Sequence, residues 1–480
     1  MGEPRLPRRN SLCVTNAFPT IGRLTKCADT IARRMSSPSS VSLPSASDRS
    51  GWLDRVLRVL SDVRAGEALT ALLFASSLFV GLFAYYVLKT LREPLILATG
   101  GAEVRSYATG VQALVLMGLI PLYSWVASRV NRSRLVLGTS AFFLVCLEVF
   151  ALLAHFEVPY IGIAFYVWLG VFVLSSVAQV WSLANDLYPQ QQGRRLFPIV
   201  ALGAPLGSAL GALAAGHLFS GGLAIPLLMQ LAAGLLLLQL GLLAIIVRRP
   251  EAKSAPAAPL TDRGGFSLVM SDTYLREIAL LLVVLNLVNT TGEYLLSRAV
   301  LGEAASALSA AGAVADPAAF RADFLRHTYG DFYFVVNVAS VLVQALVASR
   351  LVSRFGVRGA LFALPLVALG AYAAMAAGVT FVVMRAMKVA ENATDYSLEN
   401  TAKALLWLPT SRDVKYKAKQ TVDAFFVRCG DVLAAVAVFV FADRLALATT
   451  HIALVNAALA ILAFVLAVRV ARRHDGLVVE

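Results

Sequence analysis

Long apolar stretches follow one another from about residue 68 to about residue 470, separated by short polar or charged turns. A helix that crosses a bilayer needs roughly 20 mostly apolar residues, and these stretches have that length. They also lack the alternation of transmembrane strands, which need only about half as many residues. The pattern predicts twelve membrane-spanning helices, at about residues 68–88, 106–128, 135–154, 160–184, 197–218, 224–247, 275–298, 329–350, 358–379, 381–407, 421–443 and 447–470.

The composition supports the same interpretation. Of the 480 residues, 58% are hydrophobic and 15% are charged, whereas soluble domains average about 45–50% and about 25%. This excludes a soluble enzyme and a nucleic-acid-binding protein, so we expect an all-α membrane protein in a lipid bilayer. The chain contains no phosphate-binding G-x-x-x-x-G-K-[ST] loop, and its four cysteines show no paired spacing. We therefore expect no enzymatic activity, no metal and no cofactor.

The net charge of +13 is explained by topology. Placing both termini in the cytoplasm puts most Lys and Arg in the inner connections, as the positive-inside rule requires. Six remain in the outer connections, among them Lys89, Arg92 and Arg105. We therefore predict a monomeric protein of the cell (inner) membrane with both termini cytoplasmic. Residues 1–50 are rich in Ser, Pro and Arg, which is typical of a disordered extension or, alternatively, of an organelle transit peptide.

The two halves of the chain echo each other. The link ASRVNRSRLVLG begins at Ala127, and ASRLVSRFGVRG begins 221 residues later at Ala348; Pro189 and Pro409 are separated by 220 residues. Two parallel six-helix halves joined by a basic loop are typical of the major facilitator fold. The predicted organisation is an N-terminal extension at 1–66, bundles at 67–247 and 274–470, a cytoplasmic linker at 248–273 and a tail at 471–480.

Polar residues concentrate in the first, fourth, seventh and tenth predicted spans. Ionisable residues at membrane depth are costly and therefore paired, solvated or functional. In the tenth span they recur at steps of three or four, which places them on one helical face: Arg385, Lys388, Asn392, Asp395 and Glu399. These four spans line the central cavity of a major facilitator transporter, so the pattern predicts a transporter. The alternative is a set of ion pairs that never contacts a substrate.

The fifth span has a different pattern: Gly203, Gly207 and Gly211 recur every four residues. Such a stripe of small residues lets two helices approach closely. We predict a helix-packing surface there.

Three segments resemble one family, the ATP/ADP translocases (ADP,ATP carrier proteins) of obligate intracellular bacteria and plastids. They are YYVLKTLREP at 85–94, LANDLYPQQQGRRLFPIVALGAPLGSALG at 183–211, and MKVAENATDYSLENTAKALLWLPTSRDVKYKAKQTVDAFFVRCGDVLAA at 387–435. The resemblance implies a major-facilitator-like fold and exchange of ATP for ADP, or of a related nucleotide, across a membrane. It departs from the family at Asp395 and Asp431, which stand where lysines are usual.

The resemblance implies roles for particular residues. Lys89 and Arg92 match the basic pair of the first span, and Asp186 matches the acid of the fourth. The lysine run after the tenth span corresponds to Lys415, Lys417 and Lys419. Ammonium and guanidinium groups donate charge-assisted hydrogen bonds to phosphate oxygens, which suits a polyphosphate substrate.

The resulting hypothesis is a carrier whose substrate lies between the halves near the middle of the membrane. Phosphates would lie near Lys89, Arg92, Arg385 and Lys388, together with the lysine run. Four acids would pair with these cations when the site is empty, and six further residues would stack on the base or line the cavity. The acids are Asp186, Glu293, Glu391 and Asp395; the lining residues are Tyr85, Tyr86, Tyr396, Asn185, Asn289 and Asn392.

Two alternatives remain. A proton-coupled major facilitator transporter of another organic anion or drug-like solute would use Asp395 and Glu293 as titrating groups. A non-transporting sensor or assembly partner would keep the fold without its activity, although the sequence shows no signalling domain.

Overall fold

A computed structural model describes residues 67–127, 129–156, 158–188, 190–220, 224–249, 264–312, 314–411 and 414–479. The predicted N-terminal extension and most of the linker therefore lie outside the described residues. The first half of the chain forms α3 (Ala68–Ala127), α4 (Arg132–His155), α5 (Ile161–Leu187), α6 (Gln190–Ser220) and α7 (Ile225–Val247).

The second half begins with a short helix and continues with long ones, several of which contain π-helical turns. Its elements are α8 (Gly265–Ser271), α9 (Thr273–Ala311), α10 (Pro317–Val343), η2 (Gln344–Ala348), α11 (Ser349–Ala376), α12 (Phe381–Thr394), η3 (Asp395–Glu399), α13 (Asn400–Leu406), η4 (Val414–Ala418), α14 (Lys419–Thr421), η5 (Val422–Phe426), α15 (Val427–Val438), η6 (Phe439–Arg444) and α16 (Thr449–Val479).

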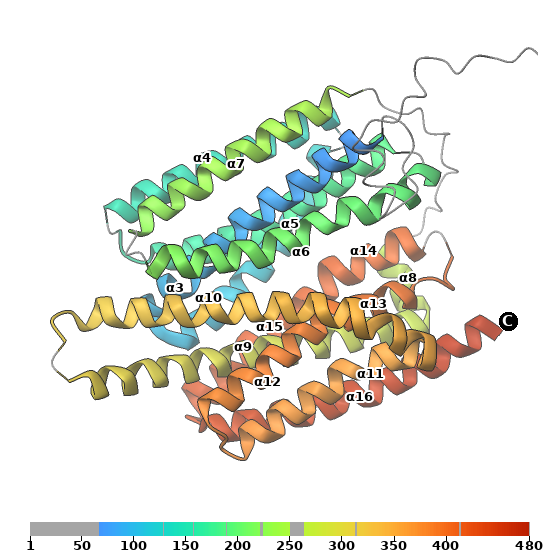
Figure 1. Ribbon diagram of the computed structural model, residues 1–480. Coiled ribbons are helices and arrows are strands. Elements are labelled where there is room, and N and C mark those ends of the chain that lie inside the picture. The colour runs from blue at the N-terminus through green and yellow to red at the C-terminus, as the bar shows by residue number, and fades with distance from the viewer. Residues whose placement is uncertain are drawn as a thin grey trace, which may run out of the picture.

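The helices gather into two bundles that follow the order of the chain (Figure 1). In the first bundle α3 packs against α5, α6 and α7, and in the second α9 packs against α15 and α16. The bundles meet where α10 packs on α6 and where α15 packs on α3.

The described chain contains ten helices that are long and apolar enough to cross a membrane. The difference from the twelve predicted spans has two causes. The helix α3 contains two spans, because the chain reverses at Gly100 and Gly101, where Gly101 has φ +80°. The helix of the tenth span carries too many charged residues to count as an apolar span: Arg385, Lys388, Glu391, Asp395, Glu399 and Lys403. The all-α fold is confirmed, and each predicted span has a helical counterpart.

The predicted end of the first span at residue 88 is wrong. The helix continues through the Arg92-Glu93-Pro94 sequence, which resembled a turn, and reverses only at Gly100. The reason is that Arg92 and Glu93 are buried and form an ion pair with each other, so the helix can continue through these two charged residues. Lys89, Arg92 and Arg105 consequently lie buried within helices rather than in an outer connection.

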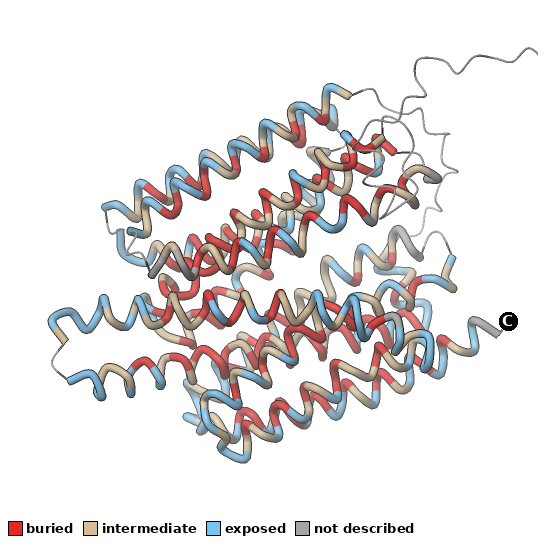
Figure 2. Tube along the Cα trace, in the orientation of Figure 1, coloured by how far each residue is buried: buried red, intermediate tan, exposed pale blue. Residues whose placement is uncertain are grey.

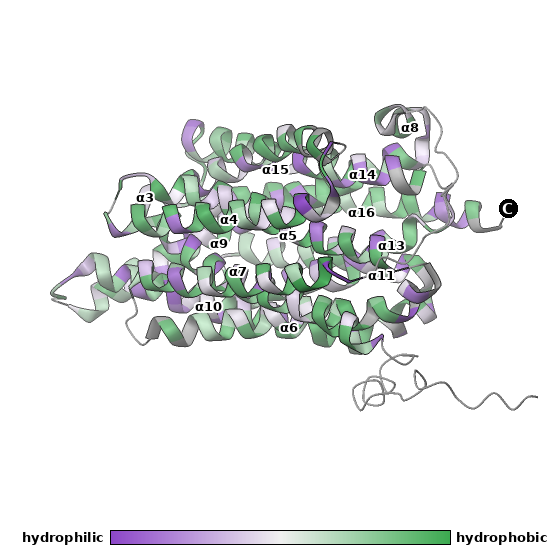
Figure 3. Cartoon of the chain, turned by 90° about the horizontal axis from the view of Figure 1, so that it is seen from above, coloured by the Kyte–Doolittle hydropathy of each residue, from purple (hydrophilic) through white to green (hydrophobic). Residues whose placement is uncertain are grey.

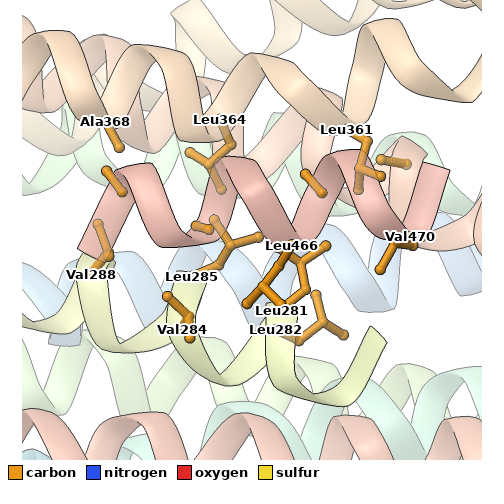
Figure 4. Packing of buried hydrophobic residues seen from close by; sticks show 14 of the residues in the cluster. Leu281, Leu282, Val284, Leu285, Val288, Leu361, Leu364, Ala368, Leu466 and Val470 are labelled. Atoms are coloured by element: carbon orange, nitrogen blue, oxygen red, sulfur yellow. The ribbon is translucent and has the colours of Figure 1, made fainter. Parts of the chain in front are cut away.

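Apolar side chains fill the interior of each bundle. In the second bundle Leu281 and Leu285 of α9, Leu364 of α11 and Leu466 of α16 interlock (Figure 4). Buried positions face the interior of each bundle, whereas the outer faces are exposed (Figure 2). Those outer faces are largely hydrophobic, and the hydrophilic residues gather near the helix ends (Figure 3). An exposed apolar surface of this kind is what a bilayer requires.

The predicted glycine stripe of α6 is a helix-packing surface. A Cβ atom built on Gly203, Gly207 or Gly211 would lie 2.0–2.6 Å from a backbone oxygen of α3. The two helices thus touch through their backbones along three turns. This contact fixes the first span, which supplies Tyr85, Lys89 and Arg92 to the site described below.

We expect Gly207→Ala to destabilise the protein, because its new Cβ would lie 2.2 Å from the Phe79 carbonyl oxygen. Overpacking of this kind typically costs about 1–3 kcal/mol, so the melting temperature of the purified protein should fall. Gly241→Ala in α7 is the matched control, since nothing lies within 4 Å of its Cβ position. Equal melting temperatures for the two variants would contradict the backbone contact.

Candidate functional site

A pocket of about 150 Å³ lies between the two halves. Its walls come from the first, second, fourth, seventh, eighth and tenth spans. The lining residues are Tyr85, Lys89, Arg92, Arg105, Thr109, Tyr166, Asn289, Thr290, Glu293, Tyr333 and Tyr396. The pocket is therefore basic and rich in tyrosine.

Glu93 is fully buried, and its carboxylate binds the charged side chains that the first half contributes. Its carboxylate accepts a bond from Arg92, and Arg105 Nε lies 2.6 Å from its Oε2. Tyr333 of α10 adds a hydroxyl donor 3.1 Å from Oε1. Two guanidinium groups and a hydroxyl from three different spans thus share one carboxylate.

Glu293 connects this cluster to the second half. Its Oε2 accepts from Arg105 at 3.1 Å, and its Oε1 accepts from Asn392 of α12 at 2.9 Å. Lys388 Nζ lies 3.6 Å from the same Oε1. Because Arg105 belongs to the first half, the Arg105–Glu293 ion pair joins the bundles directly at the pocket.

Lys388 is fully buried behind the pocket rather than in its wall. Its ammonium donates to Asn289 Oδ1 at 2.8 Å and to Glu391 Oε2 at 3.1 Å. Tyr372 of α11 donates to the Glu391 carboxylate. Gly292 makes room for this arrangement, since a Cβ there would lie 1.8 Å from the Tyr372 hydroxyl oxygen. Lys388 and Glu391 therefore form a paired network that supports the pocket.

Lys89 has a different environment from the other cations. Its side chain is buried, and among the described residues no carboxylate lies within 4 Å of its ammonium. The nitrogen lies 3.9 Å from the centre of the Tyr333 ring and 5.1 Å from that of Tyr86. Tyr85 and Tyr396 follow at 6.0 Å. Its shortest described contacts are thus cation–π contacts, and Glu293 and Glu93 attract it from a greater distance.

Further ties between the halves lie beside the pocket, toward the reversal at Gly100. Tyr294 donates to Glu103 at 2.9 Å, and Tyr107 donates to Asp443 of η6. A Cβ on Gly110 would lie 2.7 Å from the Cβ of Ala435. Between described side chains, the hydrogen bonds and ion pairs that cross between the halves involve residues 86–107 of the first half. The two bundles are thus joined closely at this end.

Several predicted site residues meet here. Tyr85, Lys89, Arg92, Asn289, Glu293 and Tyr396 line the pocket, while Tyr86, Lys388, Glu391 and Asn392 lie directly behind it. Arg105, Tyr166 and Tyr333 are pocket residues that the sequence did not indicate. Arg105 lies just before the predicted second span, and the Gly100-Gly101 pair is the sequence signal that puts the chain reversal before it.

Other predicted site residues are not brought to this pocket. Arg385 lies 4.0 Å from Asp331 of α10, and Asp395 lies 3.8 Å from Lys403. Asn185 is exposed and Asp186 half-buried near the end of α5. Lys417 and Lys419 belong to η4 and α14 at the start of the eleventh span, and the side chain of Lys415 lies outside the described part. Among the described residues, no three His, Cys, Asp or Glu side chains form a group suited to a metal ion.

Comparison with known proteins shows the fold. No protein-family model and no curated protein sequence matches the chain. Solved structures do match it, with coverage of 84–85% of this chain. They include a bacterial homolog of the human lysosomal transporter Spinster (14% identity, 98% of that chain, TM-score 0.55) and the nucleoside transporter NupG (10%, 98%, 0.61). A POT family transporter in complex with 5-aminolevulinic acid also matches (12%, 96%, 0.60).

These likenesses define the class of structure. The chain is a multi-helix membrane protein with the major-facilitator-like fold. Identities of 10–14% show the fold alone, and function must be argued from the site.

Proposed function

We propose that this protein is a membrane carrier that exchanges nucleotides, ATP for ADP or a related pair, by alternating access. The observation that carries the proposal is Lys89, a buried cation at a pocket between two bundles with no carboxylate partner among the described residues. Burying an unpaired charge costs free energy. A cation kept at a cavity wall therefore favours an anionic ligand that pairs with it.

The chemistry of the pocket suits a phosphate group beside an aromatic one. Lys89 and Arg92 supply charge-assisted donors for phosphate oxygens. Tyr85, Tyr333 and Tyr396 offer ring faces or edges on which a nucleobase can stack. The three segments that resemble the ATP/ADP translocases include Tyr85, Lys89, Arg92 and Tyr396, and one of the structural neighbours is a nucleoside transporter.

The size of the pocket implies movement. Its volume of about 150 Å³ is below the roughly 300–1,000 Å³ of sites that enclose a drug-sized ligand. A nucleotide therefore requires the halves to part around Glu293 and Arg105, whose ion pair joins them. Such rocking of one bundle against the other about a central site is the alternating-access motion of this fold.

The remaining predicted residues take supporting roles in this proposal. Lys388 and Glu391 hold Glu293 and Asn289 in position. In this proposal Arg385, Asp395, Asp186 and the lysine run at 415–419 act on the substrate outside the pocket. Both termini are cytoplasmic, and the protein works as a monomer in the cell (inner) membrane.

Exchange in vesicles tests the proposal directly. Purified protein is placed in proteoliposomes loaded with ADP, and uptake of labelled ATP is followed. Uptake should depend on internal ADP and should exceed that of protein-free vesicles and of vesicles without internal nucleotide. Folded protein that gives no uptake above these controls would refute nucleotide exchange.

A second candidate is a proton-coupled carrier of another organic anion. It is favoured by Asp395, whose ion pair with Lys403 is long at 3.8 Å and only partly buried. Substrate-driven proton movement without nucleotide on the opposite side would support this alternative and exclude obligatory nucleotide exchange.

A further inference from the structure

Glu399 closes the π-helical segment η3 in the tenth span, away from the pocket described above. Its side chain is fully buried. Neither carboxyl oxygen has a hydrogen-bond partner among the described residues. Each other buried glutamate discussed above bonds to at least two partners, so Glu399 is a titratable group that the pocket does not account for.

Two charged groups face Glu399, both on its own helix. Asp395 lies four residues before it, and Lys403 lies four residues after it. These two pair with each other, with Lys403 Nζ 3.8 Å from Asp395 Oδ1. From the eleventh span, Asp423 and Arg428 act on Lys403 rather than on Glu399. The neighbouring ammonium is thus already shared with another acid.

The protonation state follows from this geometry. An ionised carboxylate that is buried without a partner costs several kcal/mol, whereas the neutral acid avoids most of that cost. The geometry therefore favours a protonated Glu399 beside a Lys403 that neutralises Asp395.

We propose that Glu399 is a proton-binding site that couples substrate movement to a proton. This deepens the proposed carrier function and rests on it. Residues four apart lie on one helical face, so Lys403 reaches either acid. When Lys403 turns from Asp395 to Glu399, the Glu399 O–H bond breaks, its proton leaves to water and the carboxylate pairs with the ammonium. The reverse turn takes a proton from water and restores the neutral acid.

A spectroscopic experiment tests the proton site without any transport. Infrared spectra of the purified protein at neutral pH should contain the carbonyl band of a protonated carboxylic acid. Glu399→Gln should remove part of that band, and Glu303→Gln, at an exposed position of α9, should leave it unchanged. A Glu399→Gln spectrum identical to that of the wild type in this region would show that Glu399 is ionised and would overturn the proposal.

A transport experiment tests the coupling. With the membrane potential clamped, a gradient of about one pH unit can support about tenfold accumulation for one proton per substrate, because a tenfold ratio corresponds to about 1.4 kcal/mol. We expect this accumulation of ATP, in exchange for internal ADP, in the wild type and in Glu303→Gln. Glu399→Gln should lose it while keeping nucleotide-for-nucleotide exchange.

The outcomes distinguish a failure of the proposed carrier function from a failure of the proposed proton coupling. Absence of any nucleotide exchange by folded wild type refutes the carrier function, whereas wild-type exchange without proton-driven accumulation refutes the coupling alone. Lys403→Met provides a second variant should Glu399→Gln fail to fold. It removes the partner that releases the proton, so it should retain exchange and lose accumulation; unchanged accumulation would overturn the proposal.

Discussion

Lys89→Met is expected to weaken nucleotide binding and uptake by about one to two orders of magnitude while leaving the protein folded. A hydrogen bond to a charged group contributes about 1.5–3 kcal/mol, which corresponds to a loss of about 10- to 150-fold in affinity. Since Lys89 has no carboxylate partner among the described residues, its removal leaves no orphaned acid. The melting temperature of the empty protein should therefore stay constant or rise, and the increase produced by added nucleotide should shrink.

Two further variants make this result specific. Lys89→Arg keeps the charge and should keep part of the binding. Arg321→Met removes a cation from an exposed position of α10 and should bind nucleotide like the wild type. Uptake and nucleotide-induced stabilisation that persist undiminished in Lys89→Met would remove the central support for an anionic substrate at this pocket.

Glu93→Gln should have the largest effect on stability. The carboxylate is fully buried and neutralises both Arg92 and Arg105. Breaking a buried pair by removing one partner typically costs about 3–5 kcal/mol, because a charge is left uncompensated. We expect a large fall in melting temperature and in the yield of folded protein, measured by thermal unfolding and by size-exclusion chromatography.

A double variant separates charge balance from packing. Arg92 has Glu93 as its carboxylate partner, whereas Arg105 also pairs with Glu293. Glu93→Gln with Arg92→Gln should recover much of the lost stability but not transport, since Arg92 also lines the pocket. A single Glu93→Gln variant that melts like the wild type would disprove this account of the cluster.

Much of the site could be predicted from the sequence because polar residues within apolar spans are conspicuous. Lys89, Asn289 and Glu293 stand out in this way, and they line one pocket. Spacing along one helix could not show which partner a side chain meets. Arg385 shares a helical face with Lys388, yet it lies one turn further along, opposite Asp331.

The missed residues have a related physical cause. Tyr166 and Tyr333 belong to apolar spans in which a tyrosine is unremarkable, and only the packing of α5 and α10 beside α3 turns them toward the charges. Arg105 lies in a helix rather than in the predicted connection after the first span, because a buried ion pair allows α3 to continue beyond Arg92. Long-range contacts of this kind are decided by tertiary structure, which local sequence does not record.

The cations around the pocket outnumber the carboxylates, and this excess positive charge affects how the empty carrier moves. Among the described residues, Lys89, Arg92, Arg105 and Lys388 face only three carboxylates, those of Glu93, Glu293 and Glu391. An unloaded carrier that enclosed this surplus at the middle of the bilayer would face a high electrostatic barrier. A bound anion lowers that barrier, so we expect the vacant protein to switch sides slowly and net efflux of nucleotide from a cell to be restricted.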